Sequence, residues 1–400
     1  MDENNLPKII SVDDHIIEPP HAFETWLPAK FKDRGPKVVR KGLAGIEWIG
    51  PAAYKEIWDE NSDKKVDVWV YEDLVYTNKR NISAVGYPRE EWTFDPVNYD
   101  SMRPGCYDSK ARLEDMDANW MEASMIYPTM PRFCGQTFKE AKDRELALAC
   151  VEAYNNFLVE EWCGDSNGRL IPVCLIPLWD PALGAAEVRR NAARGVKAVA
   201  FSEIPHHLGL PSIHTKHWDP FFEACQETGT VICMHIGSSS KMPATSPDAP
   251  PGVTASLAFG NSMASVVDFI FSGVLVRFPD LKLSYAESQI GWLPYVLERM
   301  NDVWHDNEAW AEVKHIPEPP STYYYKNMFV SFFKDSTGIE NLGTTGVNNI
   351  QYETDYPHGD TTWPNTTQYV TKLLHGLSDA DVHKILRGNA LRMLGLDKIG

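Results

Sequence analysis

The chain has 400 residues, a formal net charge of −17 and a sequence isoelectric point of about 5.2. This acidic balance argues against nucleic acid as a partner, because such a partner needs a clustered basic face. No apolar run approaches the 18 residues of a membrane span, so we expect no membrane partner either.

The cysteines and the first residues indicate where the protein works. The seven cysteines form no Cys-x-x-Cys pair, and most of them stand in apolar surroundings. This usage is typical of reduced core thiols. The first eight residues, MDENNLPK, are polar and acidic, unlike a signal peptide. We therefore expect a cytoplasmic protein.

In chain order, short apolar runs alternate with amphipathic helical stretches. The stretch 180–195 predicts a helix with Asp180 as N-cap, Pro181 in the first turn and Gly195 at the end. Further helices are predicted over 219–229, 265–279, 291–306 and a C-terminal stretch from Ser378. The predicted strands lie in 9–20, 122–127, 169–178, 196–203, 230–237, 281–288, 328–333 and 349–355.

Eight strands alternating with helices predict an α/β fold, a (β/α)8 TIM barrel with active-site residues at the carboxyl ends of its strands. A doubly wound open sheet is the alternative, although the first strand lacks a glycine-rich phosphate turn. We expect one domain over 1–400. Residues 30–105 do not fit the alternation and are predicted to be an inserted subdomain after the first strand. Residues 238–263, rich in Pro, Ser and Gly, are predicted to form an active-site lid loop.

The first predicted strand contains Asp13, Asp14 and His15 in an apolar setting. Side chains two apart on a strand share a face, so Asp13 and His15 point one way and Asp14 the other. Buried charges of this kind need a partner or a metal. Taken alone, the stretch is equally consistent with a salt-bridged aspartate and a capping histidine.

Ionisable residues also follow the other apolar strands. Carboxylates that converge on one barrel mouth repel unless a cation joins them, and Lys334 is the one cationic residue at these ends. Oxygen and imidazole donors suit Fe, Zn or Mn, so we expect one or two divalent transition-metal ions. The predicted metal ligands are Asp13, His15, Glu203, His235, Glu287 and Asp355.

Several segments resemble the amidohydrolase superfamily, specifically its amidohydrolase-2 branch, which includes aminocarboxymuconate-semialdehyde decarboxylase. The resemblance covers most of the chain outside 30–105. It implies a metal-dependent enzyme on a TIM barrel that forms a homodimer. The segments are SVDDHIIEP, ARLEDMDANWMEASMIYPTM, GRLIPVCLIPLWDP, VICMHIG, GVLVRFPDLKLSYAESQIGWLPYVLERM, TDYPH and ILRGNALRMLGL.

The resemblance assigns ligand positions residue by residue. Asp13 and His15 stand at the first-strand His-x-His, with Asp13 departing from the first histidine. His235 takes the fifth-strand place and Asp355 the eighth-strand place. The superfamily's eighth-strand aspartate takes the proton of a metal-bound water, which implies the same catalytic role for Asp355.

Two positions matter for the reaction. Glu287 replaces the sixth-strand histidine, and Glu203 falls where binuclear members carry a bridging Lys or Glu. Together they would complete a two-metal set, with Glu287 as a ligand or a general base. We therefore expect first a hydrolase of an amide, ester, lactone or acyl thioester. The alternative is a one-metal, non-oxidative decarboxylase of an aromatic or unsaturated acid, and a third possibility is a non-catalytic binding protein.

Weaker candidates for substrate contact are His358, Lys334 and His207. Each has a plainer explanation, as a solvated loop histidine or a surface ion pair. Trp292 and Trp363 are candidates for an apolar pocket wall. The aromatic insertion and the Pro-rich lid suggest a sizeable, partly apolar small molecule as the substrate.

Overall fold

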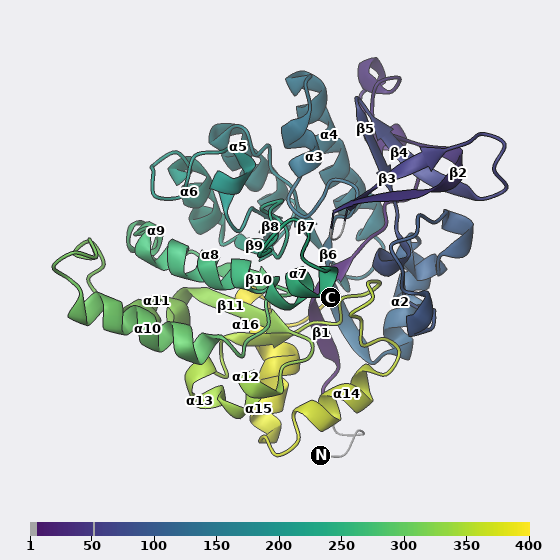
Figure 1. Cartoon of the computed structure of the whole chain (residues 1–400). Helices are drawn as coiled ribbons and strands as arrows, with labels where there is room; N and C mark the ends of the chain where they lie inside the picture. Colours follow the sequence, from purple (N-terminus) through teal and green to yellow (C-terminus); the bar gives the residue numbers. More distant parts are fainter. Residues whose placement is uncertain (1–5, 51–52) are drawn as a thin grey trace.

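The computed structural model describes residues 6–50 and 53–400; the acidic residues 1–5 discussed above lie outside the described residues. Eight strands form one parallel sheet in the order β1-β6-β7-β8-β9-β10-β11-β12, surrounded by helices (Figure 1). This confirms the predicted barrel and excludes the doubly wound sheet. The strands are β1 (Ile9–His15), β6 (Met121–Tyr127), β7 (Leu170–Cys174), β8 (Ala198–Ala200), β9 (Val231–His235), β10 (Leu283–Ala286), β11 (Met328–Phe332) and β12 (Ile350–Tyr352).

The barrel closes between β1 and the segment that follows β12. The backbone N–H of Asp355 donates to the carbonyl of Asp13 at 3.0 Å, and the N–H of His15 donates to the carbonyl of Tyr356 at 2.6 Å. These bonds join the first and last strands at their carboxyl ends. Closure therefore brings residues that lie more than 300 positions apart in the chain into one neighbourhood.

The helix predicted over 180–195 begins where the sequence indicates, whereas the one predicted over 265–279 begins at Gly260 and is divided into α8 and α9. The Asp180 side chain accepts the N–H groups of Ala182 and Leu183, which caps the helix expected there. The α-helices are α1 (Ala22–Trp26), α2 (Ser109–Ala118), α3 (Gln136–Glu140), α4 (Arg144–Asn156), α5 (Pro181–Ala192), α6 (Asp219–Thr228), α7 (Pro251–Leu257), α8 (Gly260–Phe271), α9 (Val274–Arg277), α10 (Leu293–Asp306), α11 (Pro320–Asn327), α12 (Ser336–Glu340), α13 (Leu342–Thr345), α14 (Thr366–Leu373), α15 (Asp379–His383) and α16 (Asn389–Leu394). The 3₁₀ and π-helices are η2 (Ala29–Phe31), η3 (Arg80–Ile82), η4 (Arg89–Glu91), η5 (Tyr99–Ser101), η6 (Pro104–Cys106), η7 (Phe157–Trp162), η8 (Pro205–Leu208) and η9 (Lys384–Gly388).

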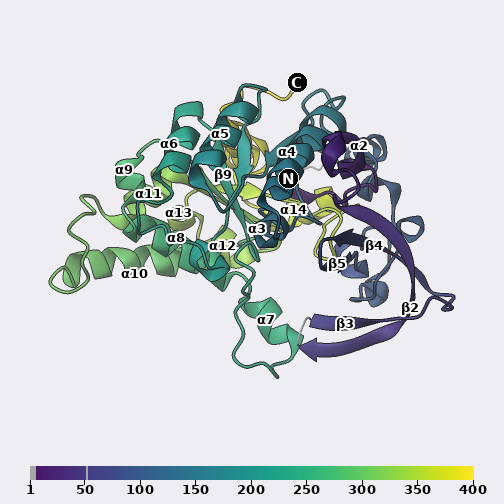
Figure 2. The ribbon, with the colours of Figure 1, turned by 90° about the horizontal axis from the view of Figure 1, so that it is seen from above.

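The insertion after β1 contains a second, antiparallel sheet that stands at one side of the barrel (Figures 1 and 2). Its strand order is β3-β2-β4-β5. Leu43, Val66 and Val68 form a small core of their own, whereas Trp69 and Tyr71 pack into the main core. The insertion is thereby attached to the barrel through β4. Its strands are β2 (Lys37–Gly50), β3 (Ala53–Trp58), β4 (Lys65–Tyr71) and β5 (Leu74–Thr77).

The segment 238–263 differs from the expected loop, because α7 and the first turn of α8 lie within it. Pro251 occupies the first turn of α7, where the missing N–H of proline is harmless, so proline here starts a helix. Figure 2 shows α7 beside the ends of β2 and β3. The role of this segment as a lid stays a prediction.

One helical stretch, Pro251–Phe271, has the length and composition of a membrane span, with 21 residues and a mean hydropathy of 1.3. The sequence reading above did not anticipate it. In the structure 39% of its most apolar window is buried, and Val266, Phe269 and Ile270 of α8 belong to the main core. Core helices of barrels pass the same test, so this stretch is weak evidence for a membrane.

Candidate active site

Three predicted ligands meet at the carboxyl ends of β1 and β9. The Nε2 atoms of His15 and His235 lie 3.2 Å apart. The Asp13 carboxylate lies 3.5 Å from the first of these nitrogens and 3.2 Å from the second. All three residues are buried, and neither carboxylate oxygen of Asp13 has a hydrogen-bond donor among the described residues. Nitrogen and oxygen lone pairs thus converge on one point.

Asp355 and His358 extend this cluster from the end of β12. An Asp355 oxygen lies 3.6 Å from Nε2 of His15 and 2.9 Å from Nδ1 of His358. The His358 ring stacks on the His15 ring, with their centroids 4.0 Å apart. His358 therefore lies in the site, which favours the functional alternative over a solvated loop histidine. Burial lowers the pKa of His358 to about 3, so its ring is neutral.

The electrostatics of the cluster fit a divalent cation. Burial and neighbouring carboxylates raise the pKa values of Asp13 and Asp355. Burial and the neighbouring imidazoles lower the pKa of His15 well below its usual value. Nδ1 of His235 contacts the carbonyl of Ile236 at 2.6 Å, which suits the tautomer with a lone pair on Nε2. Two imidazoles and two carboxylates form a donor set for a first-row divalent metal ion.

Glu287 follows β10 and reaches the same cluster. Its Oε2 lies 3.4 Å from Nε2 of His235, and 14% of the side chain is exposed. The backbone has a φ of 53°, in the left-handed region that a non-glycine residue rarely adopts. Strain of this kind concentrates at functional sites. Glu287 is thus aimed at the donors and is still open to a substrate.

Glu353 belongs to this site and was missed by the sequence reasoning. It is buried, accepts the N–H of Glu287 at 2.9 Å and also accepts the hydroxyl of Ser331. Its carboxylate holds the strained backbone of Glu287 in place. The sequence did contain a signal for it. Glu353 stands two residues before Asp355, and side chains two apart on a strand point to the same face.

Glu203 follows β8 and is buried, and its Oε2 has no hydrogen-bond partner among the described residues. One of its oxygens accepts the N–H of Gly237 at 3.1 Å, the hydroxyl of Ser239 at 3.0 Å and the amide of Asn261 at 3.0 Å. These bonds tie the segment after β9 to the start of α8. Neither group of possible metal donors among the described residues includes Glu203. Its role as a bridging ligand stays a prediction without geometric support.

Two buried charges support the site from behind. Arg112 donates to the carbonyl of His15 at 2.5 Å and to the carbonyl of Gly105 at 2.8 Å. Glu18 accepts the N–H groups of Thr129 and Met130 at 2.9 and 2.8 Å, which orders the loop after β6. These contacts fix the end of β1 from both sides.

A cavity of about 460 Å³ opens directly over Glu287, Asp355 and His358. One wall comes from the barrel and includes Lys334, while the other comes from the insertion. The proposed wall residues Trp292 and Trp363 do not line this cavity, nor does His207, which lies on η8. The insertion side consists of Asn81, Ile82, Arg89, Trp92 and Phe94.

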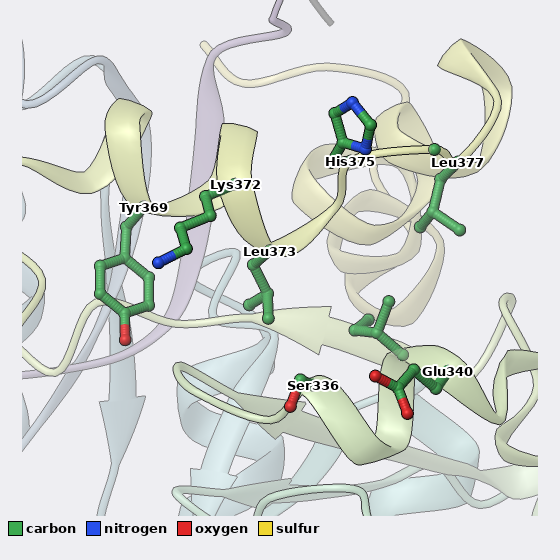
Figure 3. A pocket seen from close by; sticks show the side chains of 9 residues that line it. Ser336, Glu340, Tyr369, Lys372, Leu373, His375 and Leu377 are labelled. Atoms are coloured by element: carbon green, nitrogen blue, oxygen red, sulfur yellow. The ribbon is translucent and has the colours of Figure 1, made fainter.

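A larger hollow of about 640 Å³ lies elsewhere, between α12 and α14 (Figure 3). Figure 3 shows Tyr369, Lys372 and Leu373 on one side and Ser336 and Glu340 on the other. None of the clustered metal donors lines it. We therefore place the candidate active site in the smaller cavity, where the donors converge.

Comparisons with known proteins bear on the family and the fold of the chain. A search of curated proteins gave no match. An amidohydrolase from Mycobacterium avium subsp. paratuberculosis K-10 is similar in structure, with a TM-score of 0.73 and 24% identity over 97% of this chain and 99% of that chain.

The similar structures that contain manganese include two decarboxylases. A dihydroxybenzoic acid decarboxylase from Polaromonas sp. JS666 with bound manganese has a TM-score of 0.60 and 16% identity over 98% of each chain. A 5-carboxyvanillate decarboxylase from Novosphingobium aromaticivorans DSM 12444, complexed with manganese, has a TM-score of 0.58 and 19% identity over 73% of this chain and 81% of that chain. At such identities the likeness establishes the fold alone.

The family follows from the sequence model of the amidohydrolase-2 proteins, described as amidohydrolase, which matches residues 66–396. The match spans the barrel from β6 onward together with the second half of the insertion. The chain is a member of the amidohydrolase-2 family, and its barrel carries a cluster of possible metal donors.

Proposed function

We propose that the protein is a metal-dependent, non-oxidative decarboxylase of an aromatic or unsaturated carboxylic acid. The observation that carries the proposal is the cluster formed by two groups of possible metal donors that share His15. The case for hydrolysis depended on a two-metal set that included Glu203, and one oxygen of that carboxylate accepts three hydrogen bonds from the segment after β9 and from α8. The manganese-containing decarboxylases of the same fold support this reaction type.

The residues that would hold the metal ion are Asp13, His15, His235 and Asp355. A bound Mn²⁺, Fe²⁺ or Zn²⁺ would supply positive charge that orients the substrate's carboxylate and a neighbouring oxygen. Neutral imidazoles and buried carboxylates are the donors that such an ion needs.

Decarboxylation requires a proton on the carbon that loses its carboxylate. Glu287 lines the cavity beside the donors and is the group we assign as proton donor. The carbon takes the proton from Glu287, the bond to the carboxylate breaks, its electron pair returns to the conjugated system and CO₂ leaves. Glu287 then regains a proton from solvent. Trp92 and Phe94 line the cavity wall that orients a planar ring and excludes water.

An isotope experiment tests the reaction type. Manganese-loaded protein is incubated in D₂O with a panel that includes dihydroxybenzoic acids and 5-carboxyvanillate. We expect CO₂ release in equal amount to a product that carries one deuterium at the former carboxyl carbon. The Glu287→Gln variant should retain its metal and lose about 10²-fold or more in kcat, as expected for loss of a proton donor.

Hydrolysis is the second candidate, because Glu287 is a carboxylate at a position where it could also activate water as a base. The distinguishing measurement uses H₂¹⁸O with ester, amide and acyl thioester substrates. Incorporation of ¹⁸O into a carboxylic acid product, without CO₂ release from any acid in the panel, would overturn the decarboxylase proposal.

A further inference from the structure

Phe133, on the loop after β6, packs against one of the proposed metal donors. Its ring is stacked on the imidazole of His235, with the two centroids 4.2 Å apart and the planes 13° from parallel. The same ring lies nearly perpendicular to the imidazole of His15, with centroids 5.9 Å apart. Phe133 does not line the cavity over Glu287, so this contact lies outside the space that would admit the substrate.

The stacked ring gives the imidazole of His235 a constraint that its hydrogen bond does not supply. Nδ1 of His235 contacts the carbonyl of Ile236 at 2.6 Å. One contact at Nδ1 still lets the imidazole tilt, and Nε2 would move with it. Tyr127 also packs on the imidazole, but its plane lies at 62° to that of His235. Phe133 is stacked in parallel and thus covers a whole face of the imidazole, which fixes its plane.

The loop itself is anchored next to Phe133. The preceding residue, Arg132, has a φ of 62°, in the left-handed region that a non-glycine residue rarely adopts. Its guanidinium donates to the carboxylate of Glu140 at 2.9 Å and to the hydroxyl of Ser240, in the segment after β9. The arginine therefore joins the loop after β6 to the loop after β9, and the phenylalanine ring is held between them.

Gly237 leaves the space that this ring occupies. It has a φ of 84°, and a Cβ atom at this position would lie 2.9 Å from Cε2 of Phe133. Because that distance is shorter than a van der Waals contact, any side chain here would displace the ring or the backbone. Gly237 follows His235 by two residues. One short segment thus supplies both the imidazole and the room for the ring stacked on it.

We propose that Phe133 is a positioning residue, which acts through His235 by holding its imidazole in the plane that directs Nε2 at the metal. Gly237 is the matching position that lets the ring approach. This inference rests on the proposed function, because the orientation of the imidazole matters when a metal ion binds between the donors. It gives the loop after β6 a part in metal binding, although the loop supplies none of the clustered donors found in the described residues.

Titration of the metal-free protein with Co²⁺ and Mn²⁺ tests this inference, because the visible spectrum of Co²⁺ responds to the arrangement of its ligands. We expect Phe133→Leu to bind both ions about tenfold more weakly than the wild type and to shift the cobalt spectrum, as for loss of a group that orients a ligand. Phe133→Tyr keeps the ring and should restore both properties. The matched control is Phe278→Leu, at a half-buried position directly after α9, which should keep the wild-type affinity and spectrum.

Gly237→Ala tests the same contact with the phenylalanine still present, and it should shift the cobalt spectrum and weaken metal binding as Phe133→Leu does. Its control is Gly195→Ala, which adds the same backbone strain alone, since Gly195 has a φ of 87° and no atom within 4 Å of an added Cβ. This control should keep the wild-type spectrum.

A wild-type spectrum and affinity in Phe133→Leu would overturn the inference. If that variant does not fold, the same result in Gly237→Ala overturns it. A wild type that binds neither ion would instead overturn the proposed function, and this inference with it.

Discussion

At the scale of single residues, the site depends on donors that have few other partners. Asp13 and His15 alternate with Asp14 on β1, so the strand sends two donors into the barrel mouth and one carboxylate outward. The buried oxygens of Asp13 have no hydrogen-bond donor among the described residues. A buried carboxylate in this state is costly unless a cation neutralises it.

The double variant Asp13→Ala/His15→Ala should therefore lose its metal. We expect affinity for Mn²⁺ to fall by about 100-fold or more, since even outer-shell changes cost 10–100-fold. Metal content per chain, measured by mass spectrometry after dialysis, checks this. Far-UV circular dichroism should stay unchanged, because both side chains lie at the end of the strand.

The matched control for this pair is Asp63→Ala/His375→Ala, which removes the same side-chain types from exposed positions. It should keep the wild-type metal content. If the Asp13/His15 variant retained as much metal as this control, the ligand assignment would be wrong.

At the scale of elements, Asp14 joins β1 to β6 and to the segment after β12, at the point where the barrel closes. Its carboxylate accepts the hydroxyl of Thr354 at 2.6 Å, the N–H of Tyr356 at 2.8 Å and the hydroxyl of Ser124. One side chain on β1 thus binds both β6 and the segment after β12. These buried donors lose their acceptor together when the carboxylate is removed.

The variant Asp14→Ala should lower the free energy of unfolding by about 3 kcal/mol or more, since each buried unpaired donor costs about 1–3 kcal/mol. Urea denaturation followed by circular dichroism measures the change. Asp63→Ala, at an exposed position, should stay within about 0.5 kcal/mol of the wild type. Equal effects of the two substitutions would contradict the proposed role of Asp14 in joining β1, β6 and the segment after β12.

The loop after β6 should show a pH-dependent stability through Glu18. Burial raises the pKa of Glu18 from 4.5 to about 7. The folded state then binds a proton more tightly than the unfolded state, so this carboxyl group makes the protein less stable as pH rises from 4.5 to 7. Titration of Glu18 lowers the free energy of unfolding by at most about 3 kcal/mol over this pH range.

The variant Glu18→Gln removes this titration. It leaves one N–H, of Thr129 or Met130, without an acceptor, which is a constant cost at every pH. We expect the melting temperature of the variant, relative to the wild type, to rise between pH 5 and pH 8. A difference that stays flat over this range would show that Glu18 does not titrate as described.

At the scale of the whole molecule, the metal should stabilise the barrel, because an ion that binds only the folded state adds to its stability. At a free Mn²⁺ concentration one thousand times the dissociation constant, the added free energy of unfolding is about 4 kcal/mol. Chelation should lower the melting temperature by several degrees, and Mn²⁺ should restore it. In the Asp13→Ala/His15→Ala variant, added Mn²⁺ should leave the melting temperature unchanged.

The sequence by itself determined the barrel, and it pointed to Asp13, His15, His235 and Asp355 at the ends of its strands. Apolar runs that end at Gly, Pro and Asp marked all eight strands of the barrel and the helices in five stretches of the chain, since those signals are local. The two-residue period placed Asp13 and His15 on one face for the same reason. Local rules failed at α7, where Pro251 starts a helix within a stretch that resembles a loop.

Only the tertiary structure decided which side chains share the cavity. It gives one oxygen of Glu203 three hydrogen-bond donors of its own, and it brings Glu353 and His358 to the metal donors. The aromatic wall consists of Trp92 and Phe94 from the insertion, in place of the expected tryptophans. The physical reason is that distances between residues hundreds of positions apart depend on barrel closure and on how the insertion packs, and no local pattern encodes either.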